Sequence, residues 1–95
     1  MAHDKKAYAL TYDRLAIQEF SRLDTFWQDE TRAAIESKLA VAPELYGKPL
    51  RQTLKGCWTL RVGDYRIVYR IETKTVKILA IIHRSSNYRD IEKRI

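Results

Sequence analysis

Apolar and polar residues alternate along the middle of the chain in a pattern that predicts antiparallel strands. The alternation runs through residues 58–62 and again through residues 65–71, and only a Gly-Asp pair separates the two segments. A two-residue connection of this composition favours a tight hairpin turn of type I′ or II′. After a weaker Thr-Lys turn, residues 75–83 form a third, almost continuously apolar segment. The pattern predicts three consecutive antiparallel strands.

Helical periodicity dominates the first half, after a short β-type segment at residues 7–12. Asp13 is a suitable N-cap, and the apolar residues after it recur at helical spacing, namely Ala16, Ile17, Phe20 and Leu23. Thr25 and Gln28 have capping-box spacing, so they predict the start of a second helix. That helix must end near Pro43, and its apolar positions are Trp27, Ala34, Ile35, Leu39 and Ala42.

Two segments complete the chain. Residues 43–56 follow neither period, and they form either a functional loop or a simple crossover to the sheet. Near the C-terminus, Ile91 and Ile95 are four residues apart, which suits a short amphipathic helix. We therefore expect one domain, residues 1–95, with an α+β fold of order β-α-α-β-β-β: an antiparallel sheet, two helices packed on one face, and a short C-terminal helix or tail.

The hairpin turn decides which side chains share a face of the sheet. With Gly63 and Asp64 as the loop, Arg61 lies directly opposite Arg66. The same register, carried across the second turn, places Ile81 opposite Arg66 and His83 opposite Asp64. It also predicts a helix-covered face that consists of Trp58, Leu60, Val62, Tyr65, Ile67, Tyr69, Ile71, Val76, Ile78, Ala80 and Ile82.

The opposite face is predicted to have a cationic end formed by Arg61, Arg66, His83 and Arg84. Like charges opposite each other destabilise a sheet unless an anion lies between them. The guanidinium fork binds phosphate through two hydrogen bonds, so this end is a candidate phosphate site. The alternative is a pair of splayed, solvated arginines. The rest of this face is an apolar strip that includes Val68, Leu79 and Ile81, and only the tail, through Ile91 and Ile95, is available to cover it, so a partner protein could bind there.

Charge and composition narrow the function classes. The chain carries 18 Lys and Arg against 12 Asp and Glu, and the whole excess lies in residues 47–95. A basic half favours an anionic partner such as nucleic acid or an acidic protein, although a merely soluble basic protein has the same signature. One cysteine and two histidines give neither a disulfide nor a zinc site. The chain shows no membrane span and no signal peptide, so we expect a cytoplasmic protein without metal or cofactor.

If the bound anion is an RNA phosphate, attack by the neighbouring 2′-OH requires a base, cationic stabilisation and an acid. Arginine stays protonated and supplies only the second of these. Tyr88, flanked by Arg84 and Arg89, and His83 are the candidates for proton transfer. The structural alternatives are a tail anchor for Tyr88 and a hydrogen-bonded strand end for His83.

The segment Leu60-Arg61-Val62-Gly63-Asp64-Tyr65-Arg66-Ile67-Val68-Tyr69, with the later His83-Arg84 and Tyr88-Arg89, resembles the RelE/ParE superfamily of bacterial and archaeal toxins. The resemblance implies a cognate antitoxin that wraps the toxin in a hetero-oligomer. RelE-type members cut mRNA in the ribosomal A site without metal, leaving a 2′,3′-cyclic phosphate, whereas ParE-type members poison DNA gyrase. The resemblance also implies that Arg61, Arg66 and Arg84 bind phosphate and that Tyr88 acts as the general base.

One departure from the family pattern concerns lysines on the strand before the hairpin turn. Trp58 and Thr59 occupy that region here, and Lys55 is the nearest basic residue. Our leading hypothesis is a ribosome-dependent mRNA endoribonuclease, in which Arg61, Arg66, Arg84 and Tyr88 perform the chemistry. RNA would be contacted by Lys48, Arg51, Lys55, His83 and Arg89. The alternatives are a gyrase inhibitor and a catalytically weak antitoxin-binding module.

Overall fold

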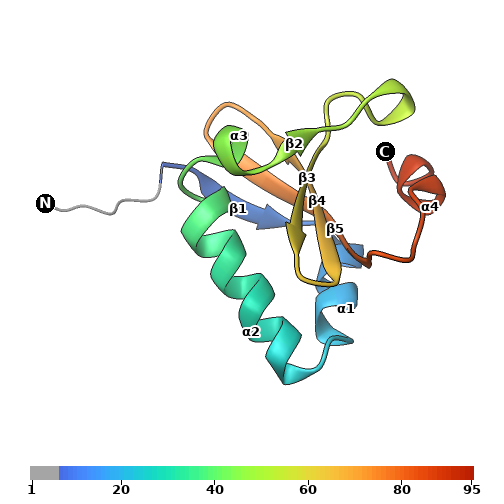
Figure 1. The fold of residues 1–95 in the computed structure, drawn as a ribbon. Coiled ribbons are helices and arrows are strands. Elements are labelled where there is room, and N and C mark those ends of the chain that lie inside the picture. The colour runs from blue at the N-terminus through green and yellow to red at the C-terminus, as the bar shows by residue number, and fades with distance from the viewer. Residues whose placement is uncertain (1–6) are drawn as a thin grey trace, which may run out of the picture.

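Five strands form one sheet in the computed structural model, which describes residues 7–95 (Figure 1). Their spatial order is β1 (Ala9–Tyr12), β5 (Thr75–His83), β4 (Tyr65–Ile71), β3 (Trp58–Val62) and β2 (Lys48–Pro49). The three predicted strands pair antiparallel, whereas β1 pairs parallel to β5. The α+β class and the predicted element order are confirmed. The sheet differs by the parallel β1 and by the short additional strand β2.

Two helices pack on one face of the sheet, as predicted. Asp13 caps α1 (Arg14–Ser21) by accepting a 3.0 Å hydrogen bond from the Leu15 N–H. The cap of α2 (Thr25–Ala34) is Asp24 rather than the predicted Thr25, and it accepts from the Trp27 N–H. Both residue types cap helices well, so the sequence left a one-residue ambiguity. The predicted stripe of α1 is also wrong at Ile17, which points outward and is 55% exposed.

Shorter elements connect the helices to the sheet. The π-helical turn η1 (Ile35–Leu39) continues α2 and ends before α3 (Pro43–Tyr46). The 3₁₀ turn η2 (Gln52–Leu54) lies between β2 and β3, and α4 (Arg89–Glu92) follows β5. The predicted loop at residues 43–56 therefore contains three short elements. No helix in the described part of the chain is both long and apolar enough to span a bilayer.

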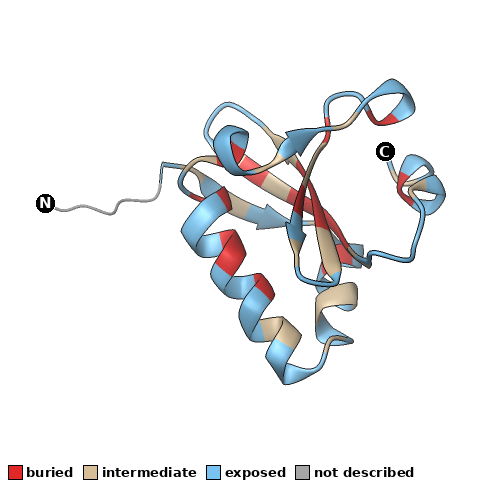
Figure 2. Cartoon of the chain, in the orientation of Figure 1, coloured by how far each residue is buried: buried red, intermediate tan, exposed pale blue. Residues whose placement is uncertain are grey.

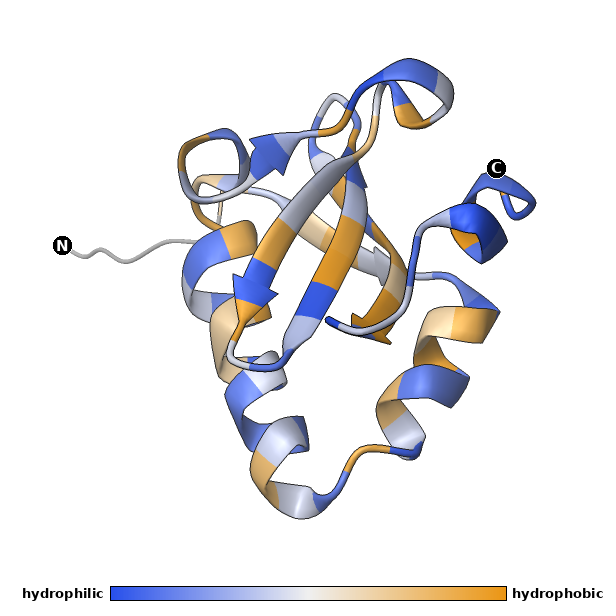
Figure 3. Cartoon of the chain, turned by 45° about the vertical axis from the view of Figure 1, so that its right-hand side comes forward, coloured by the Kyte–Doolittle hydropathy of each residue, from blue (hydrophilic) through white to orange (hydrophobic). Residues whose placement is uncertain are grey.

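Buried residues occur in the strands, in the helices and near the C-terminus (Figure 2). The apolar ones pack in two clusters, one on each face of the sheet. The cluster under α1, α2 and η1, here called the helix-side cluster, contains Ala16, Ala34, Ile35, Leu39, Leu60, Ile67, Tyr69, Val76, Ile78 and Ile81. The cluster under α4 and the loop before β3, here called the tail-side cluster, contains Leu54, Cys57, Val68, Leu79, Ala80 and Ile91. Figure 3 shows α4 and that loop beside the apolar middle of the sheet.

A β-bulge separates the observed register from the predicted one. The β3–β4 pairing is as predicted, including Arg61 opposite Arg66. Tyr69 also pairs with Ile78 as expected, but Val68 then pairs with Ala80, so one residue of β5 is left over. As a result, every side chain of β5 after the bulge lies on the face opposite to the one predicted.

The bulge overturns four predicted positions. Ile81 lies in the helix-side cluster, although it was expected on the opposite face. Ala80 and Ile82 pack on the tail side, although they were expected under the helices. His83 lies opposite Tyr65 instead of Asp64, so it leaves the face that carries the paired arginines.

The bulged edge of β5 is held by an ion-pair network. β1 pairs with β5 only as far as Ile78, so the edge beyond that residue has no neighbouring strand. Glu19 of α1 accepts a 2.9 Å hydrogen bond from the Ile81 N–H. Arg94, which follows α4, donates to the Leu79 carbonyl at 2.6 Å and contacts Glu19 at 3.0 Å. This Glu19–Arg94 bridge satisfies backbone groups of the free edge and joins the tail to α1.

Candidate phosphate-binding cleft

The paired arginines lie in a cleft of about 470 Å³ on the face of the sheet opposite the helices. Its lining residues come from α3, β2, β3, β4 and the segment before α4, and they are Tyr46, Lys48, Thr59, Leu60, Arg61, Arg66 and Tyr88. Lys48 pairs with Thr59 across the β2–β3 ladder. The structure therefore brings together four predicted site residues: Lys48, Arg61, Arg66 and Tyr88.

Positive charge in the cleft is not neutralised by the protein. Among the described residues, three cationic side chains line it and no carboxylate does. Within residues 7–95, neither Arg61 nor Arg66 has a carboxylate within 4.0 Å. The nearby Asp64 contacts Arg84 at 3.7 Å instead. Two guanidinium groups on directly opposed residues repel each other, and an anion bound between them would remove that repulsion.

Tyr88 is placed beside Arg66 by the C-terminal segment. The Arg66 Cζ atom lies 5.8 Å from the centroid of the Tyr88 ring, within the range of a cation–π contact. Tyr88 also packs against the tail-side cluster at the start of α4. The ring is therefore both the tail anchor considered from the sequence and a group next to the candidate phosphate site.

Arg84 lies at the end of the hairpin and does not line the cleft. Its N–H donates to the Asp64 carbonyl at 2.8 Å, and its side chain is 63% exposed. His83 differs more from its predicted position than Arg84 does, because it lies on the other face of the sheet. Its ring packs edge-on against Tyr65 on the helix side, and its Nδ1 atom lies 2.8 Å from the Ser85 hydroxyl. The expected convergence of His83 with the arginines is wrong because the bulge reverses its face.

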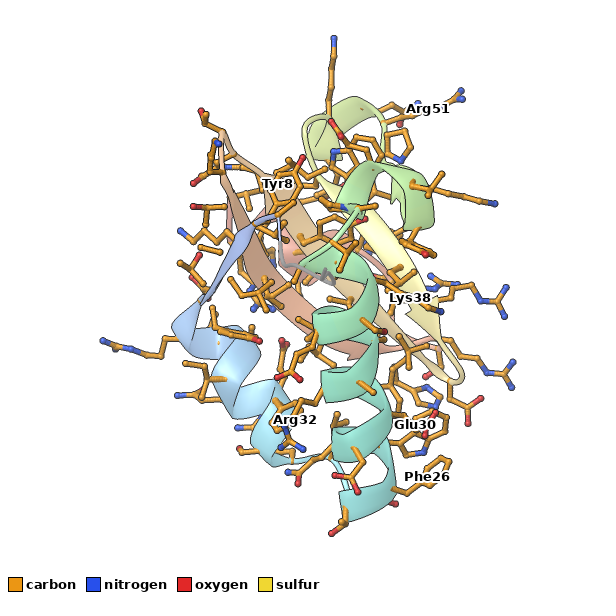
Figure 4. All side chains as sticks on the ribbon, turned by 90° about the vertical axis from the view of Figure 1, so that its left-hand side faces the viewer. Tyr8, Phe26, Glu30, Arg32, Lys38 and Arg51 are labelled. Carbon is orange, nitrogen blue, oxygen red and sulfur yellow. The ribbon has the colours of Figure 1, made fainter. Side chains whose placement is uncertain are left out.

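The remaining predicted RNA contacts lie outside the cleft. Arg51 and Lys55 are exposed on the loop before β3, where Figure 4 shows Arg51 projecting outward, and Arg89 is exposed on α4. A 2.5 Å hydrogen bond from the Thr53 hydroxyl to Glu92 joins this loop to α4. These three cations therefore belong to two segments that touch each other.

The predicted apolar strip is covered rather than open. Val68, Leu79 and Ile91 are buried together under α4 and the loop. Ile81 lies on the other face, and Ile95 alone of the five is substantially exposed, at 45%. A partner would reach the buried members only if α4 moved.

Sequence reasoning missed Tyr46. This residue lies in the segment without periodicity, and its ring borders the cleft although 46% of the residue is exposed. A large aromatic residue just before a glycine, outside any apolar stripe, was the available signal. A second hollow of about 320 Å³ lies between α2–η1 and β3, and Arg61 lines both hollows.

Burial raises the pKa of two tyrosines elsewhere in the fold. The pKa of Tyr69 is raised by desolvation alone. The pKa of Tyr12 is raised by desolvation and by Glu36, and Arg32 opposes this effect. Both lie away from the cleft lining. Across the described residues, no three side chains of the metal-binding types His, Cys, Asp and Glu come together.

Comparison with known proteins gives concordant results. Residues 10–88 match the family described as the ParE toxin of the type II toxin-antitoxin system parDE. The chain is 45% identical over 53 residues to toxin RelG of Mycobacterium tuberculosis, covering 54% of this chain and 61% of that protein. It is 47% identical over 49 residues to toxin RelE of the same organism, covering half of each chain. The chain thus matches between half and three fifths of the length of these relatives.

A solved structure extends the similarity to most of the chain. The toxin-antitoxin complex RelBE2 from Mycobacterium tuberculosis contains a chain that superposes with a TM-score of 0.79 at 29% identity. The superposition covers 87% of this chain and 98% of the other. The family match spans both arginine-bearing strands and Tyr88, and the resemblance seen in the sequence is confirmed. The chain belongs to the ParE toxin family of type II toxin-antitoxin systems.

Proposed function

We propose that this toxin is an endoribonuclease that cleaves mRNA on the ribosome, without metal, by attack of a 2′-OH on the adjacent phosphate. The main supporting observation is the Arg61–Arg66 pair, which faces a cleft with no neutralising carboxylate and has Tyr88 beside it. The two relatives named as RelE-type toxins favour this activity over the others.

Each cleft residue has a role in this proposal. Arg61 and Arg66 hold the scissile phosphate and stabilise the charge that develops on it. Tyr88 transfers protons, because its phenol group can both donate and accept one and its ring lies beside Arg66. Arg84 takes part only if it leaves Asp64, since its side chain is paired outside the cleft.

Lys48 supplies the cation that the strand before the turn lacks. Trp58 and Thr59 are not basic, but Lys48 is the cross-strand partner of Thr59 and lines the cleft. A lysine on β2 therefore brings an ammonium group to the same place, and it does so better than Lys55, which does not line the cleft. We assign Lys48 to the substrate phosphate and Arg51, Lys55, His83 and Arg89 to ribosomal RNA.

The proposed partner in the cell is a cognate antitoxin, consistent with the toxin-antitoxin complex found for the related structure. It would neutralise the toxin in a hetero-oligomer by binding at the exposed Ile95 and displacing α4, with its Ile91, from Val68 and Leu79 of the sheet. Ile81 is dropped from this surface because it faces the helices. Hydrogen exchange of the complex tests this assignment, since new protection confined to α1 and α2 would contradict it.

A gyrase inhibitor is the second candidate, because the matching family is described as ParE. Primer extension on cellular mRNA after induction separates the two. We expect cuts within translated codons for the wild type and for Arg32→Ala, an exposed arginine that does not line the cleft. Arg66→Ala and Tyr88→Phe should abolish the cuts. Intact mRNA together with DNA breaks would instead identify a gyrase poison, and normal growth would identify a binding module.

A further inference from the structure

We propose that Tyr46 is a stacking platform for a nucleobase, so that the cleft holds a nucleotide by its base as well as by its phosphate. This inference rests on the proposed ribonuclease function and specifies how the same cleft grips RNA. It concerns a residue to which neither the sequence motif nor the catalytic proposal gives a role.

The first argument is where the ring lies. Tyr46 belongs to neither apolar cluster, and 46% of the residue is exposed. It borders the cleft together with Lys48 and Arg61. Adjacent strands are about 4.8 Å apart, so β2, beside Tyr46, and β4, which carries Arg66, are about 10 Å apart. A cationic pair at one end and an aromatic ring at the other match the two ends of a nucleotide, its phosphate and its base.

The second argument is that the turn carrying the ring is held in place at both ends. The Tyr69 hydroxyl donates a 2.7 Å hydrogen bond to the carbonyl of Pro43, at the start of α3. At the other end of α3, a Cβ atom on Gly47 would lie only 1.8 Å from the Tyr69 hydroxyl, so only glycine fits there. Both ends of the turn that carries Tyr46 thus rest on one buried side chain. A fixed ring loses less conformational entropy on binding than a mobile one.

The third argument is the cation on one face of the ring. The Lys38 Nζ atom lies 5.9 Å from the centroid of the Tyr46 ring. Lys38 belongs to the π-helical turn, on the side of the helix that faces β3 (Figure 4). A cation–π contact orients the ring and leaves its opposite face for a base. The same ammonium group adds positive charge next to the path of the RNA backbone.

The test measures binding of a single-stranded octaribonucleotide that is 2′-O-methylated throughout, so that it cannot be cleaved. Copies with one abasic position each are titrated by fluorescence anisotropy against the full-length toxin. For the wild type, we expect one abasic position to weaken binding by about 5- to 100-fold, the range that corresponds to one stacked base. Because this comparison needs no protein variant, it does not depend on how a variant folds.

Variants then identify the ring responsible. Tyr46→Leu should bind the intact RNA more weakly than the wild type by a similar factor. Its affinity should then be the same for the intact RNA and for the copy with the abasic position. Tyr46→Phe should bind within about twofold of the wild type, because stacking needs the ring and not the hydroxyl. Tyr12→Leu is the matched control, since Tyr12 is similarly exposed, at 42%, and lies outside the cleft lining.

Arg66→Ala separates this inference from the function on which it rests. If Arg66→Ala weakens binding and Tyr46→Leu does not, the stacking platform is refuted and the phosphate site stands. If Arg66→Ala binds RNA as tightly as the wild type, the phosphate site itself is wrong and the inference falls with it. An equal loss for Tyr46→Phe and Tyr46→Leu would assign the effect to the hydroxyl and would also refute stacking.

Discussion

The two faces of the sheet bury similar side chains but are covered by very different elements. The helix side lies under α1, α2 and η1, which together form several helical turns. The tail side lies under a loop and α4, a helix of four residues. So short a helix has no stability of its own and depends on its contacts. The comparison indicates that the helix side maintains the fold, whereas the tail side leaves one end of the sheet open for the cleft.

The largest effect on stability is expected from Leu39→Ala on the helix side. Leu39 is fully buried, and truncating a buried leucine costs about 2–5 kcal/mol through lost burial and the cavity that remains. Urea denaturation followed by circular dichroism measures this loss. Leu45→Ala is the control, because Leu45 is 76% exposed and its truncation should be close to neutral. A loss below 1 kcal/mol for Leu39→Ala would contradict the division of labour between the faces.

A smaller effect is expected from Ile91→Ala on the tail side. Ile91 is 1% exposed, so its truncation weakens the packing of α4 on the sheet. The loss in free energy of unfolding cannot exceed the free energy that holds α4 in place, because α4 can detach by itself, and we therefore expect about 1–2 kcal/mol. Hydrogen exchange should show faster exchange at residues 88–94 while the amides of β4 stay protected. Ile95→Ala should change neither quantity, because Ile95 is already 45% exposed. Global loss of protection would show that the two faces unfold together.

A comparable or slightly smaller effect is expected from Tyr69→Phe, which leaves the Pro43 carbonyl without its donor and should cost about 1 kcal/mol. Burial raises the pKa of Tyr69, whereas the tyrosine of the unfolded chain ionises near pH 10. Above that pH the unfolded state therefore binds fewer protons than the folded state, and the wild type loses stability. The advantage of the wild type over Tyr69→Phe should shrink as pH rises above about 10. Parallel stability curves in alkaline solution would contradict this.

The smallest effect on stability is expected from Arg66→Ala, although the same substitution should abolish the proposed mRNA cleavage. Arg66 faces Arg61 and has no carboxylate partner within the described chain, so its loss relieves a repulsion. The free energy of unfolding should change by less than about 0.5 kcal/mol, or rise slightly. A clear destabilisation would mean that the arginine pair supports the fold, and the contrast between the faces would then need revision.

The difference between the faces also explains what the sequence could predict. The register of β3 and β4 follows from a two-residue turn and from alternation of polar and apolar residues, so the opposed arginines were predictable. Residues 78–82 of β5 are all apolar, and a register shift within such a segment leaves no trace in the hydropathy pattern. The bulge was therefore missed, and His83 and Ile81 were assigned to the wrong face.

Strand pairing between distant segments was the other feature that the sequence could not predict. The parallel β1 and the two-residue β2 depend on contacts between distant segments, which local patterns do not encode. For the same reason, Lys48 was predicted as an RNA contact but not as the neighbour of Thr59, and Tyr46 was not predicted at all. Arg61, Arg66 and Tyr88 were found because a turn and a recognisable motif marked them.

The bridge between Glu19 and Arg94 joins residues that are 75 positions apart in the sequence. Tyr88 reaches Arg66 from the segment that this bridge fastens to α1 and β5. A growing polypeptide that has both arginines but not yet residue 94 lacks that fastening. Because translation makes residue 94 after both arginines, Tyr88 is fastened beside Arg66 only once that later segment has been synthesised.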